Sequence, residues 1–89
     1  MRDINIYYST YSGALSSARD FYESKGYFVS DSEWFTNVSA GKKKPSVGDT
    51  NRISLYVKKN GKLIRKCLHI QVYNRGTSRK EFELNHYLF

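Results

Sequence analysis

Apolar and polar residues alternate at both ends of the chain, which is the pattern of β-strands that bury one face. The first such stretch is residues 3–8, where Ile4 and Ile6 would share a face. The last is residues 81–88, and the residues expected to point inward there are Phe82, Leu84, His86 and Leu88. We therefore expect one strand near each end of the chain.

Residues 13–25 have a longer period, because their apolar residues recur every three or four positions, as on one face of a helix. These residues are Ala14, Leu15, Ala18, Phe21 and Tyr22. Ser12 precedes them as a candidate N-cap, and Gly26 follows at the position where helices favour a left-handed C-terminal residue. The pattern predicts one helix over residues 13–25.

Three less regular segments follow the predicted helix. Residues 27–29 and 33–38 are predicted to be short extended segments, separated by the turn-forming residues 30–32. Residues 40–50 contain two glycines, three lysines and the only proline of the chain, which is typical of a loop. We expect this lysine loop to be mobile.

The strongest β signal is residues 52–73, where Asn60 and Gly61 separate two β-rich runs. Asn-Gly favours a two-residue type I′ turn, in which both central residues have positive φ. Counting from this turn pairs Val57 with Ile64, Leu55 with Lys66 and Ile53 with Leu68, so one face of the hairpin would be mostly apolar. The residues on the opposite face would be basic and aromatic, and they include Arg52, Tyr56, Lys58, Arg65, His69 and Tyr73.

The predicted order of elements is a strand, a helix and five further strands. This order favours an α+β fold, with one helix packed on a twisted antiparallel β-sheet that has a central Asn-Gly hairpin. One face of an antiparallel sheet commonly stays in water. Because 89 residues suffice for one small core, we expect a single domain over residues 1–89.

Basic residues are concentrated in the second half of the chain. Twelve Lys and Arg but only one acidic residue, Asp49, lie between Lys42 and Lys80, in a chain with a net charge of +7. Such a region would steer a polyanion towards itself. The sequence has no apolar stretch long enough to span a bilayer and no apolar signal-peptide segment, so we expect a cytoplasmic protein that does not bind membranes.

The sequence indicates neither a catalytic site nor a metal site. Cys67 is the only cysteine, so an internal disulfide and a thiolate zinc cluster are both excluded. His69 lies two residues further along the same strand, about 7 Å away, which is too far for it to act as a base for the Cys67 thiol. The lysine loop lacks the Gly-Lys-Ser/Thr ending of a Walker loop. We therefore expect no enzyme activity, no catalytic residue, no cofactor and no metal.

The basic and aromatic hairpin face is then the best candidate site. Proteins that bind single-stranded nucleic acids combine aromatic rings that stack on bases with cations that contact the backbone. With the lysine loop and the turn after the hairpin included, the candidate binding residues are Lys42, Lys43, Lys44, Arg52, Tyr56, Lys58, Arg65, His69, Tyr73 and Arg75. The same residues could instead dock on an acidic protein surface, or form a solvated face whose Tyr and Lys stems cover the sheet. The sequence leaves these three interpretations open.

Several short motifs are spread over most of the chain. They are the run from Trp34 to Ser39, Gly48-Asp49-Thr50-Asn51-Arg52, Lys59-Asn60-Gly61-Lys62, Leu68-His69-Ile70-Gln71-Val72-Tyr73 and Glu83-Leu84-Asn85. In these motifs the chain resembles small accessory proteins encoded by tailed bacteriophages. The resemblance implies a small non-enzymatic phage or prophage protein that acts inside a bacterial host cell, and it assigns no functional residues.

Proteins of that kind bind nucleic acid, or bind and block a host or defence protein. Our leading hypothesis is a non-catalytic nucleic-acid-binding accessory protein that uses the hairpin face and the lysine loop. The alternative is a phage protein that binds and inhibits a bacterial host or defence protein, with its basic surface docked on the acidic or nucleic-acid-binding face of that protein.

Overall fold

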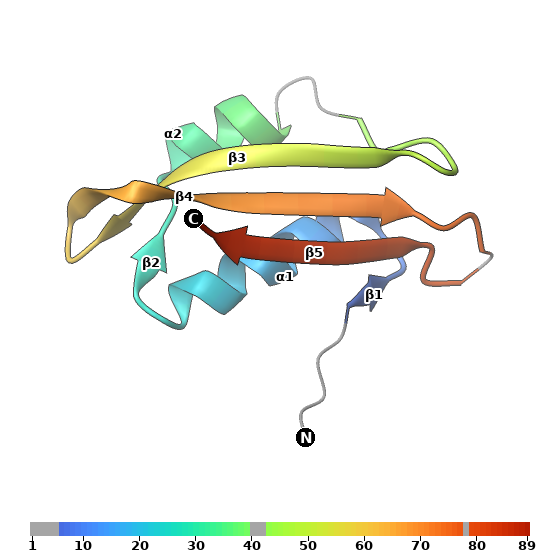
Figure 1. Cartoon of the computed structure of the whole chain (residues 1–89), viewed down its shortest axis with the longest axis horizontal. Coiled ribbons are helices and arrows are strands. Elements are labelled where there is room, and N and C mark those ends of the chain that lie inside the picture. Colours follow the sequence, from blue (N-terminus) through green and yellow to red (C-terminus); the bar gives the residue numbers. More distant parts are fainter. Residues whose placement is uncertain (1–5, 40–42, 78) are drawn as a thin grey trace.

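The computed structural model describes residues 6–39, 43–77 and 79–89, which form a helical layer packed on a curled antiparallel sheet (Figure 1). The described strands lie in the order β1-β5-β4-β3-β2. Along the chain the elements are β1 (Tyr7–Tyr8), α1 (Tyr11–Glu23), β2 (Tyr27–Phe28), α2 (Asp31–Trp34), the π-helical turn η1 (Phe35–Ser39), β3 (Thr50–Lys59), β4 (Lys62–Asn74) and β5 (Phe82–Leu88). The fold is therefore α+β.

The hydrophobic core lies between α1 and one face of the sheet. Its most buried large side chains come from the two long central strands, and they are Leu55, Val57, Leu68, Ile70 and Val72. Ala14 and Ala18 of α1 are fully buried in the same cluster. Phe21, which the helical pattern also placed inward, is instead 43% exposed at the margin of the core, where its ring contacts His86.

Helix α1 begins two residues earlier than its apolar pattern predicted. Thr10 is the N-cap, because its side chain accepts a hydrogen bond of 3.0 Å from the backbone N–H of Gly13. Ser12, the predicted cap, is an exposed residue inside the helix. At the other end the helix stops at Glu23, and Gly26 has a φ of +91°, a left-handed conformation that glycine adopts without strain.

The expectation of an extended segment at residues 33–38 is wrong, because α2 and η1 occupy this part of the chain. Ser30 caps α2 by accepting a hydrogen bond from the backbone N–H of Glu33, and Asp31 and Glu33 place negative charge in the first turn. The Glu33 carboxylate in turn accepts a hydrogen bond of 3.0 Å from the backbone N–H of Tyr56 in β3. The protein therefore has a second short helix, which lies beside β3 (Figure 1).

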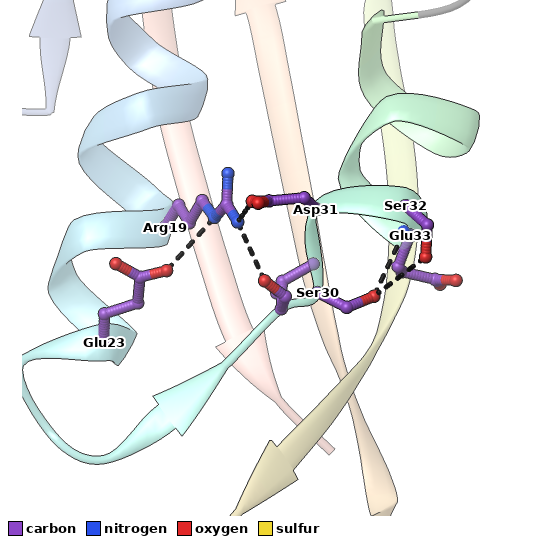
Figure 2. A network of polar contacts seen from close by, with 7 residues as sticks. Arg19, Glu23, Ser30, Asp31, Ser32 and Glu33 are labelled. Atoms are coloured by element: carbon purple, nitrogen blue, oxygen red, sulfur yellow. Dashed lines mark hydrogen bonds and ion pairs between the residues drawn. The ribbon is translucent and has the colours of Figure 1, made fainter.

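Arg19 connects α1 to this second helix (Figure 2). Its guanidinium bonds to the carboxylate of Glu23 at 3.1 Å, to the carbonyl of Val29 at 2.8 Å and to the carboxylate of Asp31 at 3.0 Å. It also lies 4.7 Å from the centre of the Trp34 ring. One side chain of α1 thus bonds to the residue that follows β2 and to the first residue of α2.

Strands β3 and β4 are joined by Asn60 and Gly61, whose φ angles are +56° and +78°. Next to the turn Lys59 pairs with Lys62 and Lys58 with Leu63, which is the register counted from a two-residue turn. Beyond Tyr56 the register shifts, and one residue of β3, Val57, lies opposite residues 64–66 of β4.

This bulge makes the predicted pairs beyond it wrong. Leu55 faces Leu68 instead of Lys66, and Ile53 faces Ile70 instead of Leu68. The shift removes a charged partner from Leu55, which is completely buried. Because the shift is by two residues, the paired side chains on either side of the bulge keep their predicted faces of the sheet, whereas Lys66 in the bulge, predicted to face Leu55, is exposed.

In the described part of the lysine loop, residues 43–49, side-chain amides of the sheet bond to the loop backbone. The Asn51 side-chain amide donates to the carbonyl of Lys43 at 2.6 Å, and the buried Asn74 amide donates to the carbonyl of Pro45 at 2.9 Å. Val47 lies so close to Gly76 that a Cβ at that glycine would be 2.7 Å from a Val47 methyl group. Residues 43–49 therefore have a defined path.

At the N-terminus, β1 covers only Tyr7 and Tyr8 of the strand predicted at residues 3–8, and Ile4 lies outside the described residues. At the C-terminus, β5 agrees with the predicted strand to within one residue. None of the described helices is both long and apolar enough to cross a membrane.

Candidate nucleic-acid interface

The sheet has one face covered by α1 and one face that we call the open face. The open face carries the residues that alternate with the core positions of β3, β4 and β5, together with their neighbours on β1 and β2. Figure 1 shows the sheet in front of α1, so that this face is turned towards the viewer.

The strand register arranges the open face in rows, because directly opposed residues of antiparallel strands point to the same side. Read across the sheet, the rows are Tyr7, Glu83, Tyr73 and Thr50; Asn85, Gln71 and Arg52; Tyr87, His69 and Ser54; Cys67 and Tyr56; and Leu63, Lys58 and Phe28. Every row except the Asn85 row contains an aromatic side chain. Aromatic residues therefore run along the whole length of the open face.

The rings on this face are accessible. Tyr56 is 62% exposed, Phe28 50%, Tyr87 46% and Tyr73 39%. Such large exposed rings are available for stacking against a flat ligand such as a nucleobase. Arg52 and Lys58 are exposed beside them, and Glu83 is the only acidic residue in the rows.

His69 is part of a fixed surface. Its Nδ1 atom is 2.9 Å from the Ser54 hydroxyl oxygen, in hydrogen-bond contact, and its ring stacks on that of Tyr87 with the centroids 4.8 Å apart. This stack spans β4 and β5 and presents one aromatic platform.

A polar depression of about 220 Å³ lies at the end of the open face nearest β1. It is lined by Thr50, Arg52, Gln71, Tyr73, Glu83 and Asn85. These residues belong to the first two rows, so three adjacent strands build the depression. Its lining combines an aromatic ring, a guanidinium, a carboxylate, two amides and a hydroxyl group.

A larger basic depression of about 610 Å³ lies beside it, around the turn between β4 and β5. Its lining residues are Tyr7, Ser9, Arg75, Arg79, Lys80 and Glu81. The Arg75 guanidinium lies over the Tyr7 ring at 4.1 Å and donates to the carbonyl of Lys80 at 3.2 Å. Because Tyr7 pairs with Glu83, the two depressions meet at the first row.

Most of the residues proposed from the sequence are on or next to the open face. Arg52, Tyr56, Lys58, His69 and Tyr73 belong to its rows. Arg75 lines the basic depression, and Arg65 is exposed in the bulge of β4.

The lysine loop is placed differently. Lys43 and Lys44 are exposed, but the Asn51 amide that holds the Lys43 carbonyl also donates to the Tyr11 hydroxyl of α1, at 3.1 Å. These two lysines are thus attached on the α1 side of the sheet. Lys42 lies outside the described residues.

Several residues of this surface were not proposed from the sequence, namely Tyr7, Phe28, Arg79, Lys80, Glu83, Asn85 and Tyr87. A signal existed for those in β5, because they alternate with Phe82 and Leu84, which were expected to point inward. No local pattern shows that Tyr7 or Phe28 pairs with the hairpin strands at the two edges of the sheet.

The part of the chain that the structure describes contains no group of three or more His, Cys, Asp or Glu side chains that could hold a metal ion. No protein-family model matches the chain, and no curated protein or solved structure is significantly similar to it.

Proposed function

We propose that the protein is a non-catalytic, phage-encoded accessory protein that binds single-stranded nucleic acid on the open face. The observation that carries this proposal is the series of accessible aromatic side chains along the strands, from Tyr73 through Tyr87 and Tyr56 to Phe28, on a face that none of the described helices covers. Successive rows are two residues, about 7 Å, apart along the strands. This spacing is comparable to the length of one extended nucleotide.

The charges around the rings suit the same ligand. Arg52 and Lys58 lie in the rows, Arg65 and Lys66 are exposed in the bulge, and Arg75 lies over Tyr7. A strand whose bases stack on the rings would bring its phosphates within reach of these cations, and each neutralised phosphate would add salt-dependent affinity. Lys43 and Lys44 add attraction from the neighbouring loop without contacting the bases.

The test is binding of a fluorescently labelled oligouridylate to the protein, followed by fluorescence anisotropy. Tyr56→Ala should weaken binding by about 1–3 kcal/mol, because stacking on this ring would be lost. The loss should be the same at low and high salt, because stacking releases no counterions. Phe35→Ala is the matched control, since Phe35 is also 62% exposed but lies in η1. An absence of oligonucleotide binding at about 50 mM salt would refute the proposal.

One observation favours the alternative, a phage protein that binds and inhibits a bacterial protein. Leu63 is 63% exposed and lies in one row with Phe28, and an exposed leucine offers no ring to a base. Together with Tyr56 it forms an apolar area that could anchor a protein interface. In that case oligonucleotides would fail to bind, and a protein partner retained from nuclease-treated bacterial lysate would be lost with a Leu63→Ser variant.

A further inference from the structure

The polar depression brings together four polar side chains that have no hydrogen-bond or ion-pair partner in the described part of the chain. Among the described residues, no hydrogen bond or ion pair engages the side chains of Arg52, Gln71, Glu83 or Asn85. Arg52 and Glu83 stand on the two outer strands of the depression, with Tyr73 on the strand between them. Neighbouring strands are about 4.8 Å apart, so Arg52 and Glu83 flank a space about two strand spacings wide.

We propose that this depression binds a guanine base of the single-stranded nucleic acid, and that the basic depression binds the phosphate next to it. The inference rests on the proposed function and adds a preferred base to it. The guanine ring would lie against Tyr73, between the carboxylate of Glu83 and the guanidinium of Arg52.

Hydrogen-bonding chemistry selects guanine. A carboxylate accepts two hydrogen bonds side by side, and guanine presents two adjacent donors, N1–H and the N2 amino group. Adenine and cytosine each place a ring-nitrogen lone pair beside their amino group, and the N3–H of uracil lies between two carbonyls. These lone pairs would face the carboxylate of Glu83 and repel it.

Arg52 matches the rest of the guanine edge. The O6 and N7 atoms are acceptors, and an arginine that donates to both is a common way of recognising guanine. Gln71 and Asn85 complete the second row beside Arg52, and their amides can donate or accept at the remaining positions.

The basic depression supplies the phosphate contact. Arg75, Arg79 and Lys80 line it against a single acidic residue, Glu81. Its Tyr7 wall is the cross-strand neighbour of Glu83, so a base held at Glu83 would have its own phosphate at the mouth of this second depression.

The experiment compares five-nucleotide uridine oligomers that carry guanine, inosine or adenine at the centre. We expect the guanine oligomer to bind about tenfold more tightly than the adenine oligomer, which is the size of one good bidentate contact. Inosine lacks the N2 amino group, so its oligomer should fall between the two. Glu83→Gln should abolish the preference for guanine, and by removing one negative charge it should raise the affinity for the all-uridine oligomer about as much as Glu81→Gln does.

Glu81→Gln is the matched control, because it makes the same change of charge in the neighbouring depression. It should raise the affinity for all three oligomers by the same factor. The phosphate contact is tested with Arg79→Ala. This variant should bind an oligomer with normal linkages more weakly than the parent protein does. It should bind an oligomer with an uncharged methylphosphonate beside the guanine as tightly as the parent protein does.

Equal binding of the three oligomers would overturn the base assignment while leaving the proposed function standing. A preference for guanine that survives Glu83→Gln would overturn the assignment of the base to this depression. An absence of binding to every oligomer, including all-uridine, would refute the proposed function as well.

Discussion

At the scale of single residues, His86 has a shifted pKa that makes a prediction about stability. It lies in β5 with its Nδ1 atom 3.0 Å from the Tyr22 hydroxyl and its ring against Phe21 and Tyr22. Burial lowers the pKa of His86 below its ordinary value of 6.5, and burial also raises the pKa of Tyr22. Both side chains are therefore neutral in the folded protein at neutral pH.

The lowered pKa of His86 predicts a loss of stability in mild acid. Below about pH 6.5 the unfolded chain takes up a proton at His86 that the folded chain resists, so the free energy of unfolding falls as the pH falls towards the folded-state pKa. Chemical denaturation between about pH 7.5 and about pH 5.5 would measure this fall. His86→Phe should flatten the dependence, and His69→Gln should leave it in place. If the free energy of unfolding of His86→Phe fell with pH as steeply as that of the parent protein, another group would be responsible for the effect.

The residue scale also shows what the sequence could reveal of the site. The alternation of side chains along the hairpin strands placed Arg52, Tyr56 and Tyr73 on the open face, because alternation is a local property of a strand. Glu83 was not recognised, although it alternates with Phe82 and Leu84, because its role depends on lying next to Tyr73 in another strand. Partnerships between strands depend on the register, which local patterns do not specify.

At the scale of elements, the sequence predicted α1 and the long strands and failed at α2. The segment around Trp34 and Phe35 is rich in the aromatic residues that favour strands, and tertiary contacts override this preference. The tertiary contacts are the bond from the Tyr56 backbone to Glu33 and the pair of Arg19 with Asp31, and the local Ser30 cap adds to them. The bulge in β4 was equally hidden, because a shift by two residues leaves the alternation of faces unchanged.

Arg19 gives the prediction that belongs to this scale. Arg19→Met should lower the free energy of unfolding by about 1–3 kcal/mol, because the Val29 carbonyl and the Glu23 carboxylate would lose a charged donor. Asp31 adds little to this figure, since its side chain is fully exposed to solvent. Urea denaturation would measure the change.

Arg79→Met is a suitable comparison, because Arg79 is exposed and lies away from the core, and it should change stability by less than about 0.5 kcal/mol. If Arg19→Met and Arg79→Met were equally stable, the contacts of Arg19 in Figure 2 would not stabilise the fold.

At the scale of the whole molecule, the fold divides a basic region that is continuous in the sequence. Lys43 and Lys44 are attached on the α1 side through Asn51, whereas Arg52 lies on the open face and Arg75 at its end. Side chains that are close neighbours along the chain thus belong to two different surfaces. Charge counted along the sequence predicts a polyanionic partner, and only the fold indicates which charges would contact it.

This division predicts different salt dependences for two double variants that each remove two positive charges. On single strands the logarithm of the affinity falls by about 0.7 per neutralised phosphate for each tenfold rise in salt. On an all-uridine strand, Arg52→Ala with Arg75→Ala should therefore reduce this slope by about 1.4, because each of the two cations would neutralise one phosphate. Lys43→Ala with Lys44→Ala should lower affinity at low salt and change the slope much less, because long-range attraction is screened within a Debye length.

Both double variants should melt near the temperature of the parent protein, since all four side chains are exposed. Equal slopes for the two variants would show that the lysine loop contacts the strand as closely as the open face does.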